Sequence, residues 1–483
     1  KEASIETNQL SDRSLGTTEA NHRLYSMEDQ MSRQTRMRIA LTLLLVGATA
    51  CSPLATAQPT AAPATQSVKE DVTLTMWFMG ADIPAQKEFS AAAAKKFEEA
   101  TGIAIVAETV SWGDATKKLT TAIAAGEGPD VTMLGSGDVA YYYQNLLDLT
   151  DEFGKTLPPT ADFVAGAFDG NTYANSTYAI PYMAQFRGQA YRQDLWSEAG
   201  YPDGPTTWTE WRAGALKIKA AHPELDSVLG MRGQGVEQYA VSLMWQNCSD
   251  MISEDGQTAT FNHPNSVEAI KFFADMVAVD GVFDLKNSEW AIADVGSRWW
   301  DGKLAWTWIS NTWVQYGKPE QIAALQAQVG YAPSLIGNQG CQRMFSAING
   351  MGIFKWTQHP EAAKQWLAFL LQPEMQALYY ELLGHLPVVT NAYAIEGVQD
   401  LGATNWLPLA QFNKPYTLHP ATSEVALLLG KIIPSIYAAV IDKSYTDTTV
   451  QQILDDLNAQ AQAALDRNPP PPGYSNPWPK PVK

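Results

Sequence analysis

Cysteine, histidine and basic side chains are scarce in this sequence of 483 residues. Three cysteines and six histidines are scattered along it, without the paired spacing that a metal site requires. Lys and Arg number 33 against 51 Asp and Glu, which gives a net charge of −18. This excess of acid argues against a nucleic acid partner, because the phosphates would be repelled. It also argues against broad electrostatic attachment to anionic lipid.

Sequence motifs of the common enzyme classes are also missing. The chain has no Gly-x-Ser-x-Gly elbow, no His-Glu-x-x-His pair and no nucleotide-binding fingerprint. Carboxylates are plentiful, so a secreted glycoside hydrolase remains an alternative, because the sequence does not fix the distance between two carboxylates. We expect a binding protein that is not an enzyme and needs no cofactor or metal.

Apolar and aromatic side chains are abundant. The sequence is 46% hydrophobic and 17% charged, which allows a large core and, at this length, two or three domains. Sixteen Trp and nineteen Tyr exceed what a core needs, and their flat faces suit stacking on sugar rings. Filling the core explains any single Trp equally well.

The first fifty residues have the pattern of a secretory signal. Three arginines precede the apolar run 39–47, and small residues lead to Cys51. The run is too short to span a bilayer core of about 30 Å as a helix. The small residues before Cys51 resemble a lipoprotein cleavage site, so we expect Cys51 to be lipidated. We assign 1–50 to a doubtful leader plus signal peptide, and the Ala-, Thr- and Pro-rich 51–70 to a tether.

Three strand–helix units follow, which predicts a parallel sheet with helices on its faces. The expected strands are 72–78, 103–110 and 131–134, and the expected helices are 84–100 and 116–125. Ligands bind at the carboxyl ends of strands in such sheets. We therefore expect one rim to hold Trp77, Trp112, Ser136 and Asp138. Tyr141 to Tyr143 is better explained as a packing face than as an iron site.

The stretch Tyr178–Trp211 connects an extended segment to a helix start, with Thr207 as N-cap and Glu210 three residues later. Its order of Pro-Tyr, Tyr-x-x-Asp-Leu, Glu-Ala-Gly, Pro and Thr-Trp-x-Glu resembles the crossover in extracellular solute-binding proteins of bacterial sugar ABC importers. Four further segments resemble that family in order: Asp301–Trp313, Ser346–Phe354, His359–Leu370 and Gly384–Val388. The resemblance covers residues 72–467. It departs at Tyr191-Arg-Gln, where the family often has Tyr-Asn-Lys.

The resemblance implies an α/β, two-lobed periplasmic-binding-protein-like fold of type II. Each lobe would be a mixed sheet flanked by helices, with a hinge between the lobes. We expect lobe one to comprise 71–183 and 333–388, lobe two 184–332 and 389–467, and the Pro-rich tail 468–483. A helix at 359–370 would bury Trp366 as a structural residue by its apolar spacing alone.

The same resemblance implies a cleft that binds a sugar or oligosaccharide and a protein that delivers it to ABC permease subunits. The expected ligand-binding residues are Trp77, Trp112, Ser136, Asp138, Tyr182, Gln185, Arg187, Trp245, Trp308, Asn311, Trp313, Arg343, Asn349 and Gly350. Arg187 and Arg343 either bind hydroxyls or pair with acids, and an anionic ligand would require one of them to be unpaired in the cleft.

We expect a monomer outside the cytoplasmic membrane, attached to it only through a lipid on Cys51. A binding protein for a non-sugar solute, such as a glycerol phosphodiester, a polyamine or ferric ion, remains an alternative. Cys248 and Cys341 are the remaining cysteines; export permits a disulfide between them, but their spacing does not indicate one.

Overall fold

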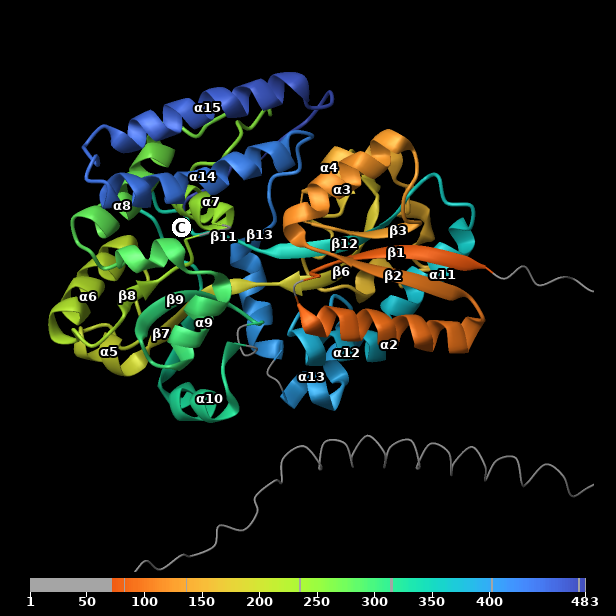
Figure 1. The fold of residues 1–483 in the computed structure, drawn as a ribbon, viewed down its shortest axis with the longest axis horizontal. Helices are drawn as coiled ribbons and strands as arrows, with labels where there is room; N and C mark the ends of the chain where they lie inside the picture. The colour runs from red at the N-terminus through yellow and green to blue at the C-terminus, as the bar shows by residue number, and fades with distance from the viewer. Residues whose placement is uncertain are drawn as a thin grey trace, which may run out of the picture. The chain divides into compact units, whose positions relative to one another are not determined.

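The computed structural model describes residues 72–81, 83–135, 137–233, 236–312, 316–400, 403–476 and 478–482. All of them belong to one compact unit, Glu70–Lys483. The unit contains two mixed sheets flanked by helices (Figure 1). The predicted α/β class with a mixed sheet in each lobe is therefore confirmed. The expected signal segment, the tether, Cys51, Ser136 and Trp313 lie outside the described residues.

The first sheet has the strand order β2-β1-β3-β12-β6. Strands β1, β2 and β3 are parallel, as expected, and β12 runs antiparallel to both β3 and β6. Helices α2 and α12 lie on one side of this sheet and α3 on the other (Figure 1). The elements are β1 (Thr73–Met79), α2 (Pro84–Thr101), β2 (Ala104–Val110), α3 (Trp112–Ala125), β3 (Val131–Leu134), α4 (Asp138–Tyr142), β4 (Thr172–Tyr173), β5 (Ser176–Thr177), β6 (Ala179–Gln185), β12 (Ala347–Ile353), α11 (Pro360–Leu370), α12 (Pro373–Leu383) and α13 (Glu396–Asp400).

Local capping explains where these helices begin and end. Helix α2 has Pro84 at its first position, and Gly102 ends it in the left-handed region at φ 76°. Helix α3 begins at Trp112, four residues earlier than expected, because the Ser111 side chain accepts a hydrogen bond from the Asp114 backbone N–H. Trp112 is consequently a helical residue and does not lie in the loop that precedes the helix.

The second sheet has the order β10-β7-β9-β8, with β8 parallel to β9 and the other pairs antiparallel. Its elements are β7 (Arg187–Arg192), α5 (Gln193–Glu198), α6 (Trp208–Ala221), β8 (Ser227–Gly230), α7 (Glu237–Gln246), α8 (Pro264–Ala278), α9 (Ile292–Trp300), β9 (Leu304–Ser310), α10 (Pro319–Leu325), β10 (Val329–Ala332), α14 (Thr422–Ile441) and α15 (Thr449–Arg467). The predicted cap of α6 is confirmed, because Thr207 and Glu210 form a reciprocal capping box.

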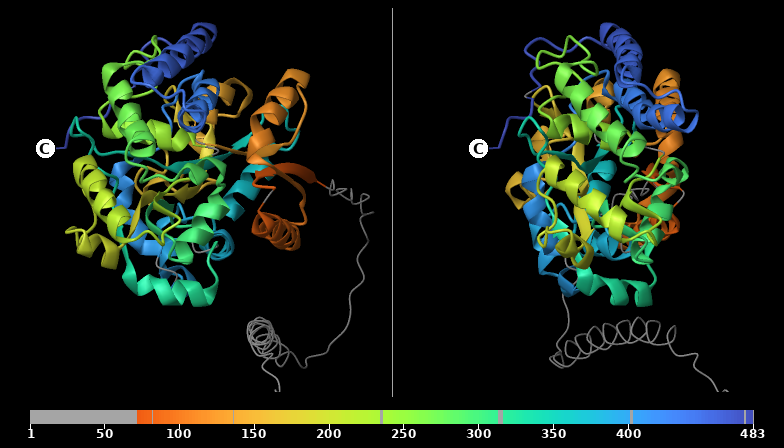
Figure 2. Two further views of the ribbon diagram at one scale, coloured as in Figure 1. Left: turned by 60° about the vertical axis from the view of Figure 1, so that its left-hand side comes forward. Right: turned by 90° about the vertical axis from the view of Figure 1, so that its left-hand side faces the viewer.

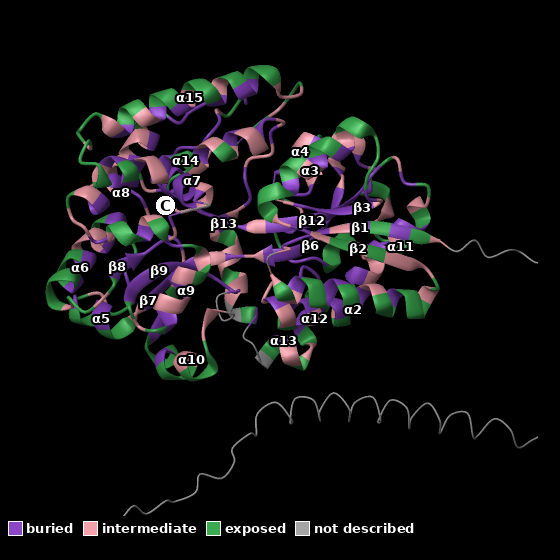
Figure 3. Cartoon of the chain, viewed as in Figure 1, coloured by how far each residue is buried: buried purple, intermediate pink, exposed green. Residues whose placement is uncertain are grey.

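The buried residues coloured purple in Figure 3 lie along both sheets, and their side chains form a separate core on each. The first core draws on residues 74–186 and 348–403, and the second draws on 191–345 and 416–465. A smaller cluster around α9 covers another part of the second sheet. Trp366 is fully buried in the first core and packs edge-on against Phe97, as predicted for a structural residue. We propose lobe boundaries that follow these cores, so that 333–345 joins lobe two and 389–403 joins lobe one.

The chain crosses between the two cores at three places, and hydrogen bonds join these places to one another. One crossing is Phe186, between β6 and β7; the second is Ser346, between β11 (Met344–Phe345) and β12. The third is β13 (Asn413–Lys414), which pairs in parallel with β11. The Asn413 side chain accepts a hydrogen bond from the backbone N–H of Arg187 at 2.8 Å and donates one to its carbonyl at 2.9 Å. These crossings form the expected connection between the lobes.

Helix α14 is long and apolar enough to cross a membrane by length and composition, and it is the one such helix in the described part of the chain. It contains Pro434, and half of its most apolar window is buried within the protein. It contributes side chains such as Leu429 and Ile433 to the second core. This burial is what a core helix shows, so we assign α14 to the fold of the second lobe.

Cys248, just after α7, forms a disulfide with Cys341, just before β11. This pairing resolves the question that the spacing of the cysteines left open. The described part of the Pro-rich tail beyond α15 forms no helix, and it turns at Gly473, where the Tyr474 N–H donates to the Pro471 carbonyl (Figure 2). The Asn476 side chain donates hydrogen bonds to Asp250 and to the Ile252 carbonyl, and the Val482 N–H donates to the Gly340 carbonyl.

Candidate functional site

The carboxyl ends of strands β8 and β9 meet the start of β7 and the N-terminus of α7. Arg187, the first residue of β7, pairs with Ser310 at the end of β9, because these strands are antiparallel. Arg232 follows β8 by two residues, and Tyr239 lies in the first turn of α7. The carboxyl ends of parallel strands are where α/β sheets bind ligands. We call Arg187, Arg232, Tyr239, Trp308, Phe345 and Tyr416 the arginine–aromatic cluster.

Aromatic rings pack against both arginines of this cluster. The Arg187 guanidinium carbon lies 4.7 Å from the centre of the Phe345 ring, and that of Arg232 lies 5.6 Å from the centre of Tyr239. Phe345 contacts Tyr416 with ring centres 4.4 Å apart, and Tyr239 stacks on Trp308 at 4.9 Å and 29°. The rings thus pack against the flat faces of the guanidinium groups, and the N–H groups at the guanidinium edges remain available for hydrogen-bond acceptors.

The arginines form no ion pair with any described carboxylate. Arg187 donates from Nη2 to Gln185 Oε1 at 2.9 Å, whereas its Nη1 is buried and has no partner among the described residues. Arg232 Nε is likewise buried without a partner there. Burial, together with the positive charge of Arg232, lowers the pKa of Arg187 to about 10, so it remains charged at neutral pH.

Further buried polar atoms around the cluster have no hydrogen-bond partner in the described chain. They are Tyr416 Oη, Trp308 Nε1, His385 Nδ1 and Asn311 Oδ1. Burial and the nearby charge of Arg187 lower the pKa of His385 to about 4, so its ring is neutral at pH 7. Buried polar groups are normally hydrogen-bonded. Several unpaired ones at one place therefore mark a position where a polar ligand can satisfy them.

The first lobe contributes Trp112, Gly135 and Asp138 near its junction with the second lobe. Trp112 is 40% exposed, and its ring lies against Gly135, where an added Cβ would come within 3.3 Å of it. The Gly135 backbone N–H donates to Asp138 at 2.8 Å, and the Ser423 hydroxyl of α14 donates to the same carboxylate at 3.1 Å. Burial raises the pKa of Asp138 to about 6.

Other expected site residues hold the lobes together. Gln185 donates to the Thr312 hydroxyl at 3.0 Å, across the junction between the cores. Asn311 donates to the Gly384 carbonyl of the first lobe. Together with the Asp138–Ser423 bond, these contacts place Asp138, Gln185 and Asn311 at the lobe junction, beside the arginine–aromatic cluster.

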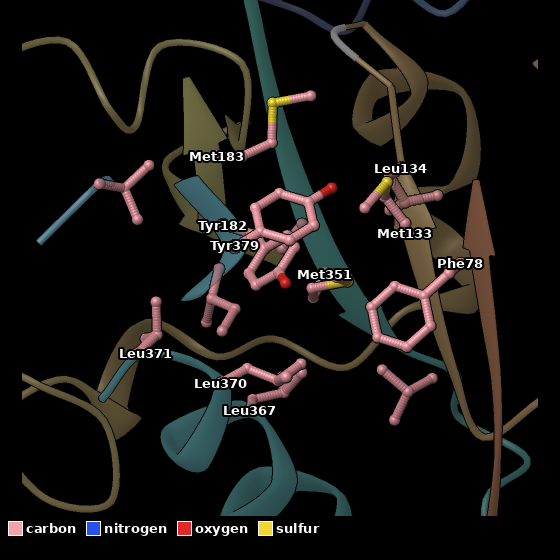
Figure 4. Packing of buried hydrophobic residues seen from close by; sticks show 14 of the residues in the cluster. Phe78, Met133, Leu134, Tyr182, Met183, Met351, Leu367, Leu370, Leu371 and Tyr379 are labelled. Carbon is pink, nitrogen blue, oxygen red and sulfur yellow. The ribbon is translucent and has the colours of Figure 1, made fainter. Parts of the chain in front are cut away.

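Two expected residues of the first lobe pack within their sheet. Trp77 lies in the middle of β1 and is partly buried, with Lys118 Nζ 4.2 Å from its ring centre, so it faces α3. Tyr182 is fully buried against Phe89 and Tyr379 (Figure 4). We leave both out of the proposed site because neighbouring side chains already cover their rings.

The remaining expected residues, of which Trp245, Asn349 and Gly350 are buried, have neighbours outside the arginine–aromatic cluster. Trp245 is in the last turn of α7, within the second core. Asn349 and Gly350 lie in β12, and a Cβ on Gly350 would come within 2.0 Å of Asn171. Arg343 faces Asp250 and Asp169, whose charges oppose the lowering of its pKa by burial. These positions favour structural roles.

Sequence reasoning missed Arg232, Tyr239, His385, Phe345 and Tyr416. Arg232 offered a usable signal, because it follows a predicted strand at its carboxyl end. Phe345 and Tyr416 offered none, since they meet only where the chain crosses between the lobes.

A cavity of about 500 Å³ lies elsewhere along the junction between the lobes. It is lined by uncharged side chains, among them Tyr141, Tyr142, Tyr143, Pro420 and Asn468. The predicted packing face of tyrosines therefore also borders open space. No group of three His, Cys, Asp or Glu suited to a metal ion occurs among the described residues.

The model of the bacterial extracellular solute-binding protein family matches residues 80–377. A putative binding protein of Brucella abortus is 27% identical over 386 residues, covering 77% of this chain and 89% of that protein. The diacetylchitobiose binding protein DasA of Streptomyces coelicolor is 28% identical over 325 residues, covering 65% and 73%.

The maltose-bound structure of T. maritima MalE3 superposes with a TM-score of 0.68 at 21% identity, covering 80% of this chain and all of that one. This similarity confirms the two-lobed fold expected from the sequence. The family consists of binding proteins that act outside the cytoplasm, and not of enzymes. The match spans more than half of the chain, so the protein belongs to the bacterial extracellular solute-binding protein family.

Proposed function

We propose that this protein captures a carbohydrate between its lobes, at the arginine–aromatic cluster, and delivers it to the permease of an ABC transporter. The observation that carries the proposal is the set of buried, unpartnered polar atoms next to stacked rings. Sugars present hydroxyl groups around an apolar ring face, and both are matched here. Relatives named for diacetylchitobiose and maltose binding support a saccharide as ligand.

Capture requires the lobes to separate and close. Trp308 is 2% exposed and packs against Trp211, Tyr239 and Trp306 of its own lobe, so it supports the cluster from the second core. The Gln185–Thr312 and Asp138–Ser423 hydrogen bonds would break on opening and form again around the ligand. The three tied crossings around Asn413 would serve as the hinge, since few residues there need to change conformation.

Delivery places the protein at the cell envelope. The cationic and apolar pattern before Cys51 supports export and a lipid anchor, with the 51–70 segment as the tether to the membrane. Metabolic labelling with a radioactive fatty acid tests the anchor. Label retained by the wild type and lost on Cys51→Ser would support it, and no label on either would refute it.

Thermal unfolding of residues 68–483 against mono- and oligosaccharides tests capture. A ligand that binds only the folded state adds about 2.7 kcal/mol of stability at 100 times its dissociation constant. We expect one saccharide class to raise the unfolding midpoint by several degrees, and calorimetry to give one site per chain. If no saccharide, neutral or acidic, binds, the proposal is wrong.

A further inference from the structure

The arginine–aromatic cluster contains two arginines and too few carboxylates to neutralise their charge. The charge of Arg232 lowers the pKa of Arg187, which shows that the two guanidinium groups repel each other. Glu237 is the carboxylate that acts on Arg187, and it ranks behind Arg232 in its effect and forms no ion pair with either arginine within the described chain. The site therefore retains about one uncompensated positive charge by simple counting of these three groups.

The other neighbours do not supply the missing charge. His385 is neutral at pH 7, and Tyr416, whose pKa burial raises well above its ordinary value, is a neutral phenol. The N-terminus of α7 adds positive potential, since its N-cap residue Val236 has no side chain that accepts the free backbone N–H groups. Arg187 has only the neutral Gln185 Oε1 as a side-chain acceptor, and the buried Nε of Arg232 has none in the described chain, so a site that holds both cations is suited to an anion.

The aromatic rings do not remove the need for an acceptor. Phe345 and Tyr239 cover the faces of the guanidinium groups, whereas the N–H bonds lie in the guanidinium plane and point past the rings. Arg187 Nη1 and Arg232 Nε are buried and lack acceptors in the described chain. Planar N–H pairs match the two oxygens of a carboxylate or of a phosphodiester better than a single hydroxyl.

We propose that the solute bound here carries a monoanionic oxyacid group, held jointly by Arg187 and Arg232, on an otherwise polyhydroxylic molecule. The inference deepens the proposed function, on which it rests, because it assigns the charge of the cargo to the same site. An acidic saccharide is the carboxylate form of such a ligand, and a glycerol phosphodiester is the phosphate form.

Matched ligand pairs test the proposal by calorimetry at low and high salt. The pairs are galacturonate with galactose, glucuronate with glucose, and glycerophosphoglycerol with glycerol. A charge-assisted hydrogen bond gives about 10- to 100-fold in affinity, so one acidic member should bind at least about 10-fold tighter than its neutral partner. Binding of an acidic sugar identifies a carboxylate, and binding of the diester alone identifies a phosphate; either supports an anionic ligand, but the second also overturns carbohydrate capture.

Substitutions locate the effect. Arg187→Gln and Arg232→Gln should each abolish the preference for the acidic ligand, because the affinity for the acidic member of a pair falls further than the affinity for the neutral one. Arg192→Gln, at the other end of β7, removes an arginine already paired with Asp194 at 2.5 Å and serves as the matched control, with the preference retained. Should Arg187→Gln fail to fold, Arg232→Gln decides.

The failures of the two proposals are distinguishable. Equal affinity for the members of every pair, or a preference that survives both arginine substitutions, overturns the anionic ligand and leaves saccharide capture standing. Binding of none of the six compounds or of longer neutral and acidic saccharides overturns both.

Discussion

The Asp138 carboxylate at the start of α4 accepts a hydrogen bond from the Ser423 hydroxyl on α14 across 3.1 Å, which joins the first lobe to the second. The same carboxylate accepts the Gly135 N–H at 2.8 Å. Burial outweighs both bonds, since it raises the pKa of Asp138 from 3.8 to about 6. The junction between the lobes is therefore sensitive to pH.

Asp138→Asn tests that sensitivity. Because the pKa of Asp138 is higher in the folded chain, its contribution to stability is complete below pH 3.8 and is lost as pH rises through about 6. The asparagine variant should match the wild type near pH 4 and exceed it by up to about 3 kcal/mol at pH 8. Thermal unfolding at both pH values measures the difference.

Two buried histidines make the folded protein less stable as pH falls, which is the opposite of the trend for Asp138. The unfolding midpoints of the variant and the wild type must therefore be compared at the same pH. Burial lowers the pKa of His385 and of His419 to about 4, and their contribution is lost as pH falls from 6.5 through 4. Asp447→Asn, at a fully exposed carboxylate, is the control. A gain at pH 8 no larger than that of the control would contradict the prediction.

The Cys248–Cys341 disulfide should contribute strongly to stability. It closes a loop of 93 residues, and restriction of the unfolded chain by such a loop is worth about 4 to 5 kcal/mol. We expect the double Ser variant to unfold several degrees below the oxidised wild type. Reductant should lower the midpoint of the wild type to that of the variant and leave the variant unchanged; a midpoint indifferent to reductant refutes the contribution.

Substitutions of Trp112 and Trp366 should distinguish an effect on ligand affinity from an effect on stability. Trp112→Ala removes a ring that is 40% exposed, so stability should change by less than about 0.5 kcal/mol. If the ring stacks on the saccharide, affinity should fall about 2- to 10-fold. Trp366→Ala leaves a cavity in the first core, which costs about 3 to 5 kcal/mol. Unchanged calorimetric affinity in Trp112→Ala would remove Trp112 from the site.

Tyr182→Phe tests the removal of Tyr182 from the expected site. Its hydroxyl is buried and has no partner in the described chain, so its loss should leave stability unchanged or raise it by up to about 1 kcal/mol. The affinity for the saccharide should be unaffected. A well-folded variant that binds about 10-fold more weakly would return Tyr182 to the site.

Much of the fold could be predicted from local patterns. The strand at 131–134 and the capping box of α6 were predicted residue by residue, because the apolar run and the Thr207–Glu210 spacing are local signals. Helix α14 received no prediction. It is apolar on nearly all sides and contains Pro434, so it shows neither a polar face nor an uninterrupted helical run.

The site could be predicted only in part. The family resemblance predicted Arg187, Gln185 and Trp308 as site residues, and they also lie at or next to the proposed site, since they flank the crossover and a strand end. Tyr182 shares the crossover, but β6 is buried along its length except at Gln185, and Tyr182 packs within the first core. The partners of Arg187 come from β11 and from the segment after β13, and only the tertiary fold brings those together.

The strand order of the first sheet also sets the order in which the lobes can form. Strand β12 lies between β3 and β6, yet it is synthesised after all four strands of the second sheet. The first sheet therefore exposes two unpaired edges until residue 353 has arrived, while β7 to β10 can already pair among themselves. Such non-local pairing slows folding and leaves partly folded chains prone to aggregation. We therefore expect the first lobe to complete its sheet after the second lobe, although its sequence begins first.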